Sequence, residues 1–391
     1  MKTMKTFAAI CGLACGLTSG ADADILAMLS YESKSPDSLK SLKLGGPQER
    51  REGIAIMQVD PEATDFGKII WDMPLPADLV AHHIFYDRTM AKAYITALGK
   101  KELRVMDMTA SPYSVKTMAV NCSMGEDVVF DEANKRWFLT CMDSGNVIVG
   151  DVATDAIIGE IKVPGTYPHG LAVNSAINRI LITSTVSGDL STPDERITEV
   201  DATTYEVLNH IKLSKKPSPS GEAPVEVLFV PGAEVPTAYV TNMFGGTLWT
   251  ATWNKNTGSF DTEQVYDFGA SEGVGVPLEI YFNDDSSKLF VTTANPGRFH
   301  IFDISKNAGM PKHMKTLKVG EGAHHAGFTK DGRYAVVQNS FLNLPGMNSG
   351  LMHVLDMETE EVVKTITTFA DAGLNPNVIV LLPKWNAFAG H

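Results

Sequence analysis

Histidine and acidic side chains recur in short β-rich segments that lie far apart in the 391-residue chain. Two of these segments contain adjacent histidines, His82-His83 and His324-His325. The complete set is His82, His83, Glu126, Asp127, His169, Glu226, Glu279, His324 and His325. Imidazole nitrogens combined with carboxylates suit zinc, copper, iron or nickel, whereas calcium and magnesium prefer oxygen ligands alone. A fold that brings these segments together would therefore create a metal centre or a catalytic site.

The elements that must position these residues form a repeat. Five segments consist of an apolar pair followed by threonine: Tyr94-Ile95-Thr96, Phe138-Leu139-Thr140, Leu181-Ile182-Thr183, Tyr239-Val240-Thr241 and Phe290-Val291-Thr292. Each follows a polar turn and another β-rich run, and two such runs predict a hairpin. An apolar run ending in aspartate comes next: Val105-Met106-Asp107, Val149-Gly150-Asp151, Glu199-Val200-Asp201, Ile301-Phe302-Asp303 and Val354-Leu355-Asp356. A turn and a fourth strand complete a unit of four antiparallel strands, here called A to D.

A four-stranded unit of about 50 residues has the size of a β-propeller blade. Six complete units occupy residues 80–370, and a seventh is divided between the two ends of the chain. For this blade the sequence predicts strands C and D at Ile54–Asp60 and Lys68–Trp71, and strands A and B at Asn377–Leu382 and Trp385–Phe388. Pairing the two ends removes exposed sheet edges. We therefore predict an all-β fold over residues 24–391, a seven-bladed propeller of four-stranded antiparallel blades.

Tyr239-Val240-Thr241-Asn242 resembles the tetrapeptide that names the YVTN-type propeller repeat, and the other threonine segments are similar to it. This resemblance implies an architecture and no particular function, because propellers host many unrelated activities.

Strand A is the innermost strand of a blade, so its first residues stand at one mouth of the channel. Aligning the A strands gives one column with His82, Glu126, His169, Glu226 and His324, and a next column with His83, Asp127, Gly170, Glu279 and His325.

This convergence predicts a metal centre at the channel mouth. The predicted ligands are His82, His169 and His324, with His83, His325 and Glu126 as further ligands, and Glu226 or Glu279 as proton acceptor. Neighbouring side chains of a strand point to opposite faces, so one histidine of each pair is expected to point inward. Three long B-to-C loops are expected to cover the histidines and form a substrate pocket: Ser184–Arg196, Asn295–Arg298 and Asn339–Gly350.

Ala81-His82-His83 and Ala323-His324-His325 resemble the double-histidine motifs of copper-dependent propeller oxidoreductases. These are methanethiol oxidase of the selenium-binding protein family and thiocyanate dehydrogenase. The resemblance implies a copper cofactor, with iron and zinc as alternatives, and oxidation of a small-molecule substrate. Tyr167-Pro168-His169-Gly170 is similar to a segment of virginiamycin-type lyases, which leaves a metal-assisted lyase or a lactonase-like hydrolase open. A non-catalytic YVTN-repeat binding scaffold is the third hypothesis.

Residues 1–23 have the features of a signal peptide. Lys2 and Lys5 precede an apolar run from Phe7 to Leu17, and Ala21-Asp22-Ala23 is a cleavage pattern. We therefore expect a periplasmic protein, with secretion as the alternative, and no membrane insertion. The net charge of −13 argues against nucleic acid as a partner and favours small molecules. A separate redox partner protein is left open.

Two cysteines, Cys122 and Cys141, remain after the signal peptide. An oxidising compartment permits a disulfide between them. Simple hairpin pairing, however, places Cys141 opposite Asp127, and metal ligation by Cys122 is an alternative. Four further histidines are expected to be structural: His300 and His353 on C strands, His210 on a D strand and His313 in a loop.

Overall fold

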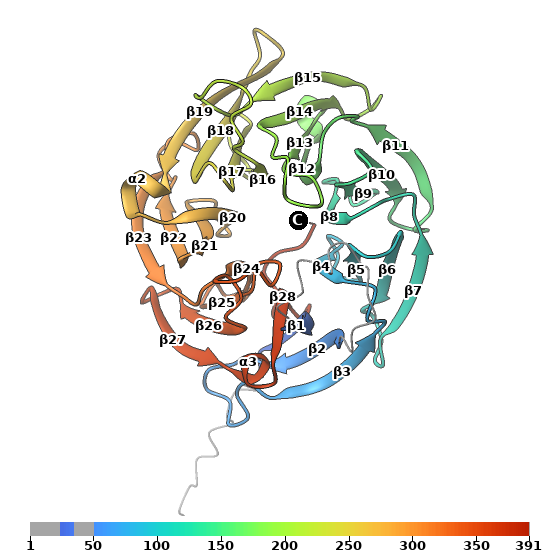
Figure 1. Cartoon of the computed structure of the whole chain (residues 1–391), viewed down its shortest axis with the longest axis vertical. Coiled ribbons are helices and arrows are strands. Elements are labelled where there is room, and N and C mark those ends of the chain that lie inside the picture. Colours follow the sequence, from blue (N-terminus) through green and yellow to red (C-terminus); the bar gives the residue numbers. More distant parts are fainter. Residues whose placement is uncertain (1–23, 35–50, 391) are drawn as a thin grey trace, which may run out of the picture.

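The computed structural model describes residues 24–34 and 51–390, so the predicted signal peptide at residues 1–23 lies outside the described residues. The chain forms seven four-stranded antiparallel sheets, and its colours run once around a ring in Figure 1. The prediction of an all-β, seven-bladed propeller is confirmed. Within the described ranges there is no helix of the length and apolar character that crossing a membrane requires.

The blades are numbered 1 to 7 in ring order, with strands A to D running outward from the channel. The A strands are β4 (Ala81–Tyr86), β8 (Gly125–Phe130), β12 (Pro168–Asn174), β16 (Pro224–Phe229), β20 (Gly275–Phe282), β24 (Ala323–Phe328) and β28 (Leu374–Leu381). The B strands are β5 (Lys92–Ala97), β9 (Arg136–Cys141), β13 (Arg179–Ser184), β17 (Thr237–Asn242), β21 (Lys288–Asn295), β25 (Tyr334–Asn339) and β1 (Leu26–Ser33).

The outer strands complete each blade. The C strands are β6 (Glu102–Asp107), β10 (Asn146–Asp151), β14 (Arg196–Asp201), β18 (Thr247–Asn254), β22 (Gly297–Asp303), β26 (Leu351–Asp356) and β2 (Glu52–Gln58). The D strands are β7 (Ser114–Ala119), β11 (Ile157–Lys162), β15 (Val207–Lys212), β19 (Ser259–Asp267), β23 (Lys312–Lys318), β27 (Glu361–Ile366) and β3 (Ile69–Leu75). Short helices are η1 (Ser175–Ile177), α2 (Phe268–Glu272) and α3 (Thr368–Asp371).

The aspartate that ends strand C stabilises the turn to strand D. Asp107 Oδ1 accepts hydrogen bonds from the backbone N–H and the hydroxyl of Thr109, at 2.8 and 2.6 Å. Asp201 Oδ1 accepts from the backbone N–H groups of Thr203 and Thr204, both at 2.8 Å. Aspartate is favoured in such turns because its short side chain bonds the backbone two or three residues on. This explains why the aspartate recurs at the same place in the repeat.

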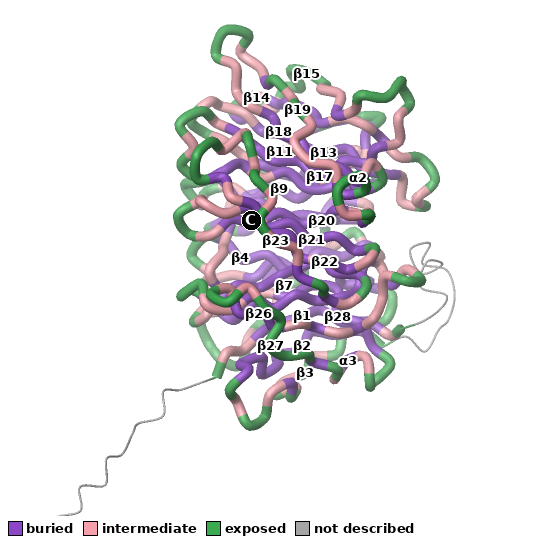
Figure 2. The backbone as a smooth tube through the Cα atoms, turned by 90° about the vertical axis from the view of Figure 1, so that its left-hand side faces the viewer, coloured by how far each residue is buried: buried purple, intermediate pink, exposed green. Residues whose placement is uncertain are grey.

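The hydrophobic core lies between the blades. Seven clusters of buried apolar side chains among the described residues fill the seven interfaces between neighbouring sheets. Between blades 1 and 2, for example, Tyr94 packs against Phe130 and Trp137 with ring centroids 5.2 and 6.2 Å apart. The side view shows buried backbone through the strands and exposed backbone at the turns of both faces (Figure 2). This packing joins each blade to its neighbours, and the inner strands surround the channel.

The ring closes differently from the prediction. β1 lies between β28 and β2, with Ser30 opposite Val378, so blade 7 takes three strands from the N-terminal part and one from the C-terminal part. The prediction that Trp385–Phe388 forms strand B was wrong, because the buried run Leu26–Ser33 occupies that place. Residues 385–390 instead cross the A-to-B face, where Gly390 N–H donates to Tyr86 O at 2.9 Å. The chain thus ends near the centre of the ring (Figure 1).

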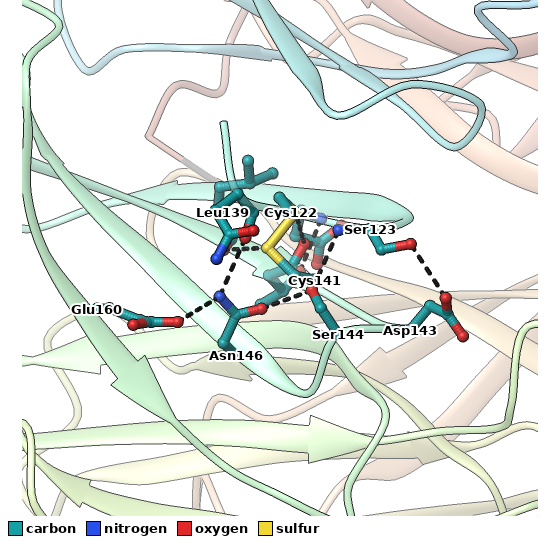
Figure 3. Close-up of a disulfide and its surroundings, with 11 residues drawn as sticks. Cys122, Ser123, Leu139, Cys141, Asp143, Ser144, Asn146 and Glu160 are labelled. Carbon is teal, nitrogen blue, oxygen red and sulfur yellow. Dashed lines mark hydrogen bonds between the residues drawn. A yellow bond between two sulfur atoms is a disulfide. The ribbon is translucent and has the colours of Figure 1, made fainter. Parts of the chain in front are cut away.

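Cys122 and Cys141 form a disulfide in blade 2, with Cα atoms 5.1 Å apart (Figure 3). Cys141 lies opposite Gly125 and not opposite Asp127. Glu126 and Asp127 together oppose Thr140, which adds one residue to β8. The simple pairing expected from the sequence was therefore wrong. Both sulfur atoms are used in the disulfide, which excludes Cys122 as a metal ligand.

Candidate metal centre

A β-bulge at the start of the inner strand positions the predicted site residues in six blades. In blade 1, Ala81 pairs with Ala97 and Ile84 with Ile95, so His82 and His83 together oppose one residue, Thr96. The other bulged pairs are Glu126-Asp127, His169-Gly170, Val225-Glu226, Leu278-Glu279 and His324-His325. A bulge bends the strand and redirects its side chains. Regular alternation does not hold here, and the expectation that one histidine of each pair points away was wrong.

The repeated threonine holds this bulge. His83 N–H donates to Thr96 Oγ1 at 3.0 Å, and the equivalent bond from Asp127 to Thr140 measures 2.9 Å. Glu226 and Glu279 make the same bond, at 3.2 Å, to Thr241 and Thr292. A hydroxyl can accept this hydrogen bond and still donate another. The threonine of the YVTN-type repeat therefore fixes the backbone from which the site residues project.

The same threonine also joins neighbouring blades. Thr183 Oγ1 donates to Val225 O, and Thr241 Oγ1 donates to Leu278 O, both at 2.6 Å. In blades without this threonine, other side chains do the same: Ser30 Oγ donates to His82 O at 2.8 Å, and Gln338 Nε2 donates to Asn377 O at 3.0 Å. The carbonyl that accepts belongs in each case to the start of the inner strand of the next blade. Adjacent inner strands are thus held in register around the channel.

The five histidines come together, and His83 lies among them. Its ring stacks on His82 at a centroid distance of 3.8 Å and lies 4.5 Å from the ring of His325. The rings of His324 and His169 lie 5.9 and 6.2 Å from His83. Ligand atoms of His83, His324 and His325 all lie within 4.8 Å of one another, as do those of His82, His83 and Glu126. His83, expected from the sequence as an additional ligand, is the residue common to both groups.

Carboxylates lie beside the imidazoles. Glu126 Oε2 lies 3.1 Å from His82 Nε2 and 3.6 Å from His169 Nε2. Glu279 makes the corresponding pair on the other side of the channel, 3.2 Å from His324 Nε2 and 3.6 Å from His325 Nδ1. Asp127 Oδ1 is 3.2 Å from His83 Nδ1. These contacts orient the rings, as carboxylates beside metal-binding imidazoles commonly do.

Burial and charge set different protonation states for the histidines. Burial lowers the pKa of His82, but the carboxylates of Glu126, Glu32 and Asp127 together raise it more, so this pKa lies above its usual value. Burial raises the pKa of Glu126, yet His82 and His169 hold it below its ordinary value. Burial, together with the nearby imidazoles of His82 and His169, lowers the pKa of His324 to about 3, even though Glu279 is adjacent. His324 is therefore neutral at neutral pH, the form in which imidazole binds a metal.

Glu226 occupies a different column from the one predicted. The bulge of blade 4 consists of Val225 and Glu226, so Glu226 is equivalent to His83 and Asp127, and not to His82. It still belongs to the site, because its carboxylate, Asp127 and His169 have ligand atoms within 4.8 Å of one another. A Cβ atom on Gly170 would lie 2.9 Å from Glu226 Oε1, so the glycine leaves the space that Glu226 needs.

Two of the three predicted loops cover the histidines. The connections 184–196 and 339–350 contribute Val186 and Phe341 to one buried apolar cluster, and the Phe341 ring lies 5.4 Å from that of His324. The third, Asn295–Arg298, is not a long loop, because β21 ends at Asn295 and β22 begins at Gly297. The covering loops make an apolar cap.

A cavity of about 570 Å³ lies on the side of the histidines that faces away from the covering loops. The second halves of the A strands form its walls, with His325 and Ala326 at the site end and the C-terminal residues Phe388 and Gly390 along one side. Tyr281 and Phe328 add aromatic surface. The charged residues Arg88, Glu132 and Asp284 also line it. A largely apolar cavity that contains some polar groups is typical of a small-molecule site. The cavity therefore reaches His325 from the A-to-B face of the ring.

No family model and no curated protein matches this chain. Solved structures do match. A hypothetical selenium-binding protein from Sulfolobus tokodaii has a TM-score of 0.73 at 13% identity, covering 95% of this chain and 96% of that chain. A candidate 6-phosphogluconolactonase from Bacteroides fragilis has a TM-score of 0.62 at 11% identity, covering 93% and 99%. Hydrazine synthase from Kuenenia stuttgartiensis gives 0.58 at 14%, covering 79% and 92%. At these identities the likeness shows the propeller fold alone, and the predicted resemblance is confirmed at that level.

Several residues of the site were not predicted. The buried Glu52 accepts hydrogen bonds from the backbone N–H groups of Val80 and Ala81, at 3.2 and 2.9 Å, and so fixes the segment just before the first histidine pair. Ser30 and Gln338 replace the repeated threonine in blades 7 and 6. In the sequence, the position of Glu52 directly before the apolar run of β2 could have indicated that this carboxylate is buried. Ser30 lies in β1, a strand that the repeat pattern did not predict, so the sequence did not indicate that Ser30 takes the place of the repeated threonine.

Proposed function

We propose that this chain is a copper-dependent oxidoreductase that acts on a small molecule in the propeller channel. One observation carries the proposal: imidazoles and carboxylates from six blades meet in one buried cluster, with His83 common to two groups of ligand atoms within 4.8 Å. Burying several ionisable groups is unfavourable unless they are paired, hydrogen-bonded or bound to a metal. A set in which imidazoles outnumber the carboxylates favours copper or zinc over calcium and magnesium.

The residues fit such an ion. The Nδ1 atom of His169 is buried and has no hydrogen-bond partner among the residues that the structure describes. The low pKa of His324 gives a neutral imidazole. His82, His83, His169, His324 and His325 are the proposed ligands, with Glu126 as a further ligand or as the carboxylate that orients His82 and His169. A bound copper ion would supply one-electron redox chemistry; iron would supply the same, and zinc would not.

The carboxylates have separate proposed roles. Glu279 holds His324 and His325 in orientation through its two contacts of 3.2 and 3.6 Å. Glu226 is the better candidate for the proton acceptor, because its carboxylate lies beside His169 and Asp127 at the edge of the histidine cluster. The substrate would reach His325 through this cavity, whose size favours a small molecule. Export to the periplasm by residues 1–23, and a redox partner protein, belong to the same proposal.

Metal analysis of the protein purified from the periplasm tests this function. We expect bound copper with a copper electron paramagnetic resonance signal in the oxidised protein. The double variant His82→Ala/His324→Ala should lose this copper, and the control His210→Ala should keep it, because His210 lies on the outer strand β15. Unchanged copper content in the folded double variant would refute the site. Zinc in place of copper would favour the metal-assisted hydrolase or lyase, and a folded protein without metal would favour the binding scaffold.

A further inference from the structure

A second group of metal-binding residue types lies far from the channel, in blade 5. His300 is on β22, His313 is on β23, and Glu272 ends helix α2. His313 was expected in a loop, and the structure places it on the strand. Glu272 Oε1 lies 3.2 Å from His300 Nδ1 and 3.2 Å from His313 Nε2. One ligand atom from each of the three residues lies within 4.8 Å of the others.

These separations match the edges of a zinc coordination tetrahedron. Zinc–nitrogen and zinc–oxygen bonds of about 2.0–2.2 Å imply ligand-to-ligand distances of roughly 3.3–3.5 Å. The two nitrogen-to-oxygen distances of 3.2 Å are close to this range. The Thr316 hydroxyl lies 3.1 Å from His300 Nδ1 and 2.9 Å from His313 Nε2, so it must rotate away to admit the ion. Two imidazoles and one carboxylate leave the fourth position of a tetrahedral site for a water molecule.

Neighbouring side chains fix the orientation of all three residues. Tyr266 Oη donates to Glu272 Oε1 at 2.8 Å, and its ring stacks on His313 at a centroid distance of 5.4 Å. The Phe268 ring lies 4.8 Å from His300, and the Thr293 hydroxyl is 3.1 Å from His300 Nε2. Partners on the far ring nitrogen are a regular feature of metal-binding histidines, because they select the tautomer that presents the other nitrogen.

Access and location also suit an ion. His300 is fully buried, whereas the side chains of His313 and Glu272 remain 27% and 19% exposed, so an ion can enter from solvent. Helix α2 belongs to the connection between the last strand of blade 4, β19, and the first strand of blade 5, β20. An ion bound by the three residues would tie this connection to the outer strands of blade 5.

We propose that Glu272, His300 and His313 form a zinc site that fastens helix α2 to β22 and β23. The site shares no residue with the channel cluster. Its presence or absence is independent of the proposed oxidoreductase function. The alternative is a hydrogen-bonded network in which Glu272 needs no ion, because Tyr266 and Thr316 already donate to it.

Zinc titration of chelator-treated protein, followed by calorimetry, distinguishes these alternatives. We expect wild-type protein to bind one more equivalent of Zn²⁺ than His313→Ala and Glu272→Gln, and His210→Ala to behave as wild type. Zinc should also raise the unfolding temperature of wild type more than that of either variant. Glu272→Gln keeps a hydrogen-bond acceptor for Tyr266, which guards against misfolding. Equal zinc stoichiometry in wild type and in both folded variants would overturn the proposal.

Discussion

Substitution of Gly170 by alanine should disturb the channel site without removing any candidate ligand. A Cβ atom on Gly170 would lie 2.6 Å from Val225 O, 2.9 Å from Glu226 Cα and 2.9 Å from Glu226 Oε1. An ordinary contact begins at 3.4 Å, so the carbonyl oxygen of Val225 must move away by the difference of 0.8 Å. The obstacle is mainly backbone, which hydrogen bonds with Thr183 and Thr241 hold on both sides. Rotation of a flexible side chain therefore cannot relieve it.

Overpacking of this kind costs about 1–3 kcal/mol. We expect urea unfolding of Gly170→Ala to give a free energy of unfolding lower by this amount. We also expect a weaker metal affinity in the channel, because the bulge that carries the candidate ligand His169 is displaced with Gly170. The matched control is Gly275→Ala on β20, another inner strand, where the nearest atom to the new Cβ would be Asn295 O at an ordinary 3.7 Å. If Gly170→Ala unfolded at the same urea concentration as wild type and bound metal equally well, the role assigned to the bulge would be wrong.

Three further predictions follow from the same structure. Thr241→Val removes a hydroxyl that accepts from Glu226 N–H and donates to Leu278 O, and urea unfolding should show a loss of about 2–4 kcal/mol, because two buried groups lose a partner; no loss would contradict the role of the repeated threonine. The double variant Cys122→Ser/Cys141→Ser opens a link across 19 residues and should lose about 3 kcal/mol, while a reducing agent should destabilise only wild type. Burial lowers the pKa of His353 to about 4, below about 6.5 in the unfolded chain. As the pH decreases, His353 therefore takes up a proton in the unfolded state before it does so in the folded state. The free energy of unfolding should fall between about pH 6.5 and about pH 4, by at most about 3 kcal/mol. His353→Asn should flatten this part of the stability–pH curve, and an unchanged slope would exclude His353 as its source.

Local sequence determined the architecture of this protein. A strand requires a run of apolar residues, a hairpin requires a polar turn, and the aspartate after strand C bonds the next turn directly, so each signal acts within a few residues. Repetition of these signals predicted the blades, and the position of the acidic and histidine residues on strand A predicted that they would meet in the channel. For His82, Glu126, His169 and His324, the place in the repeat was therefore enough to assign them to the candidate site.

Tertiary structure decided how the pieces join and which way the site residues point. The alternation rule failed at His82-His83 because a bulge depends on a threonine of the neighbouring strand and on contacts between blades. Ring closure by β1 was missed for a similar reason: strand pairing between Leu26–Ser33 and β28 joins residues more than 340 positions apart and leaves no local signal. The apolar cavity and the cap over the histidines likewise arise from segments that meet only when the ring closes, since packing depends on all seven blades together.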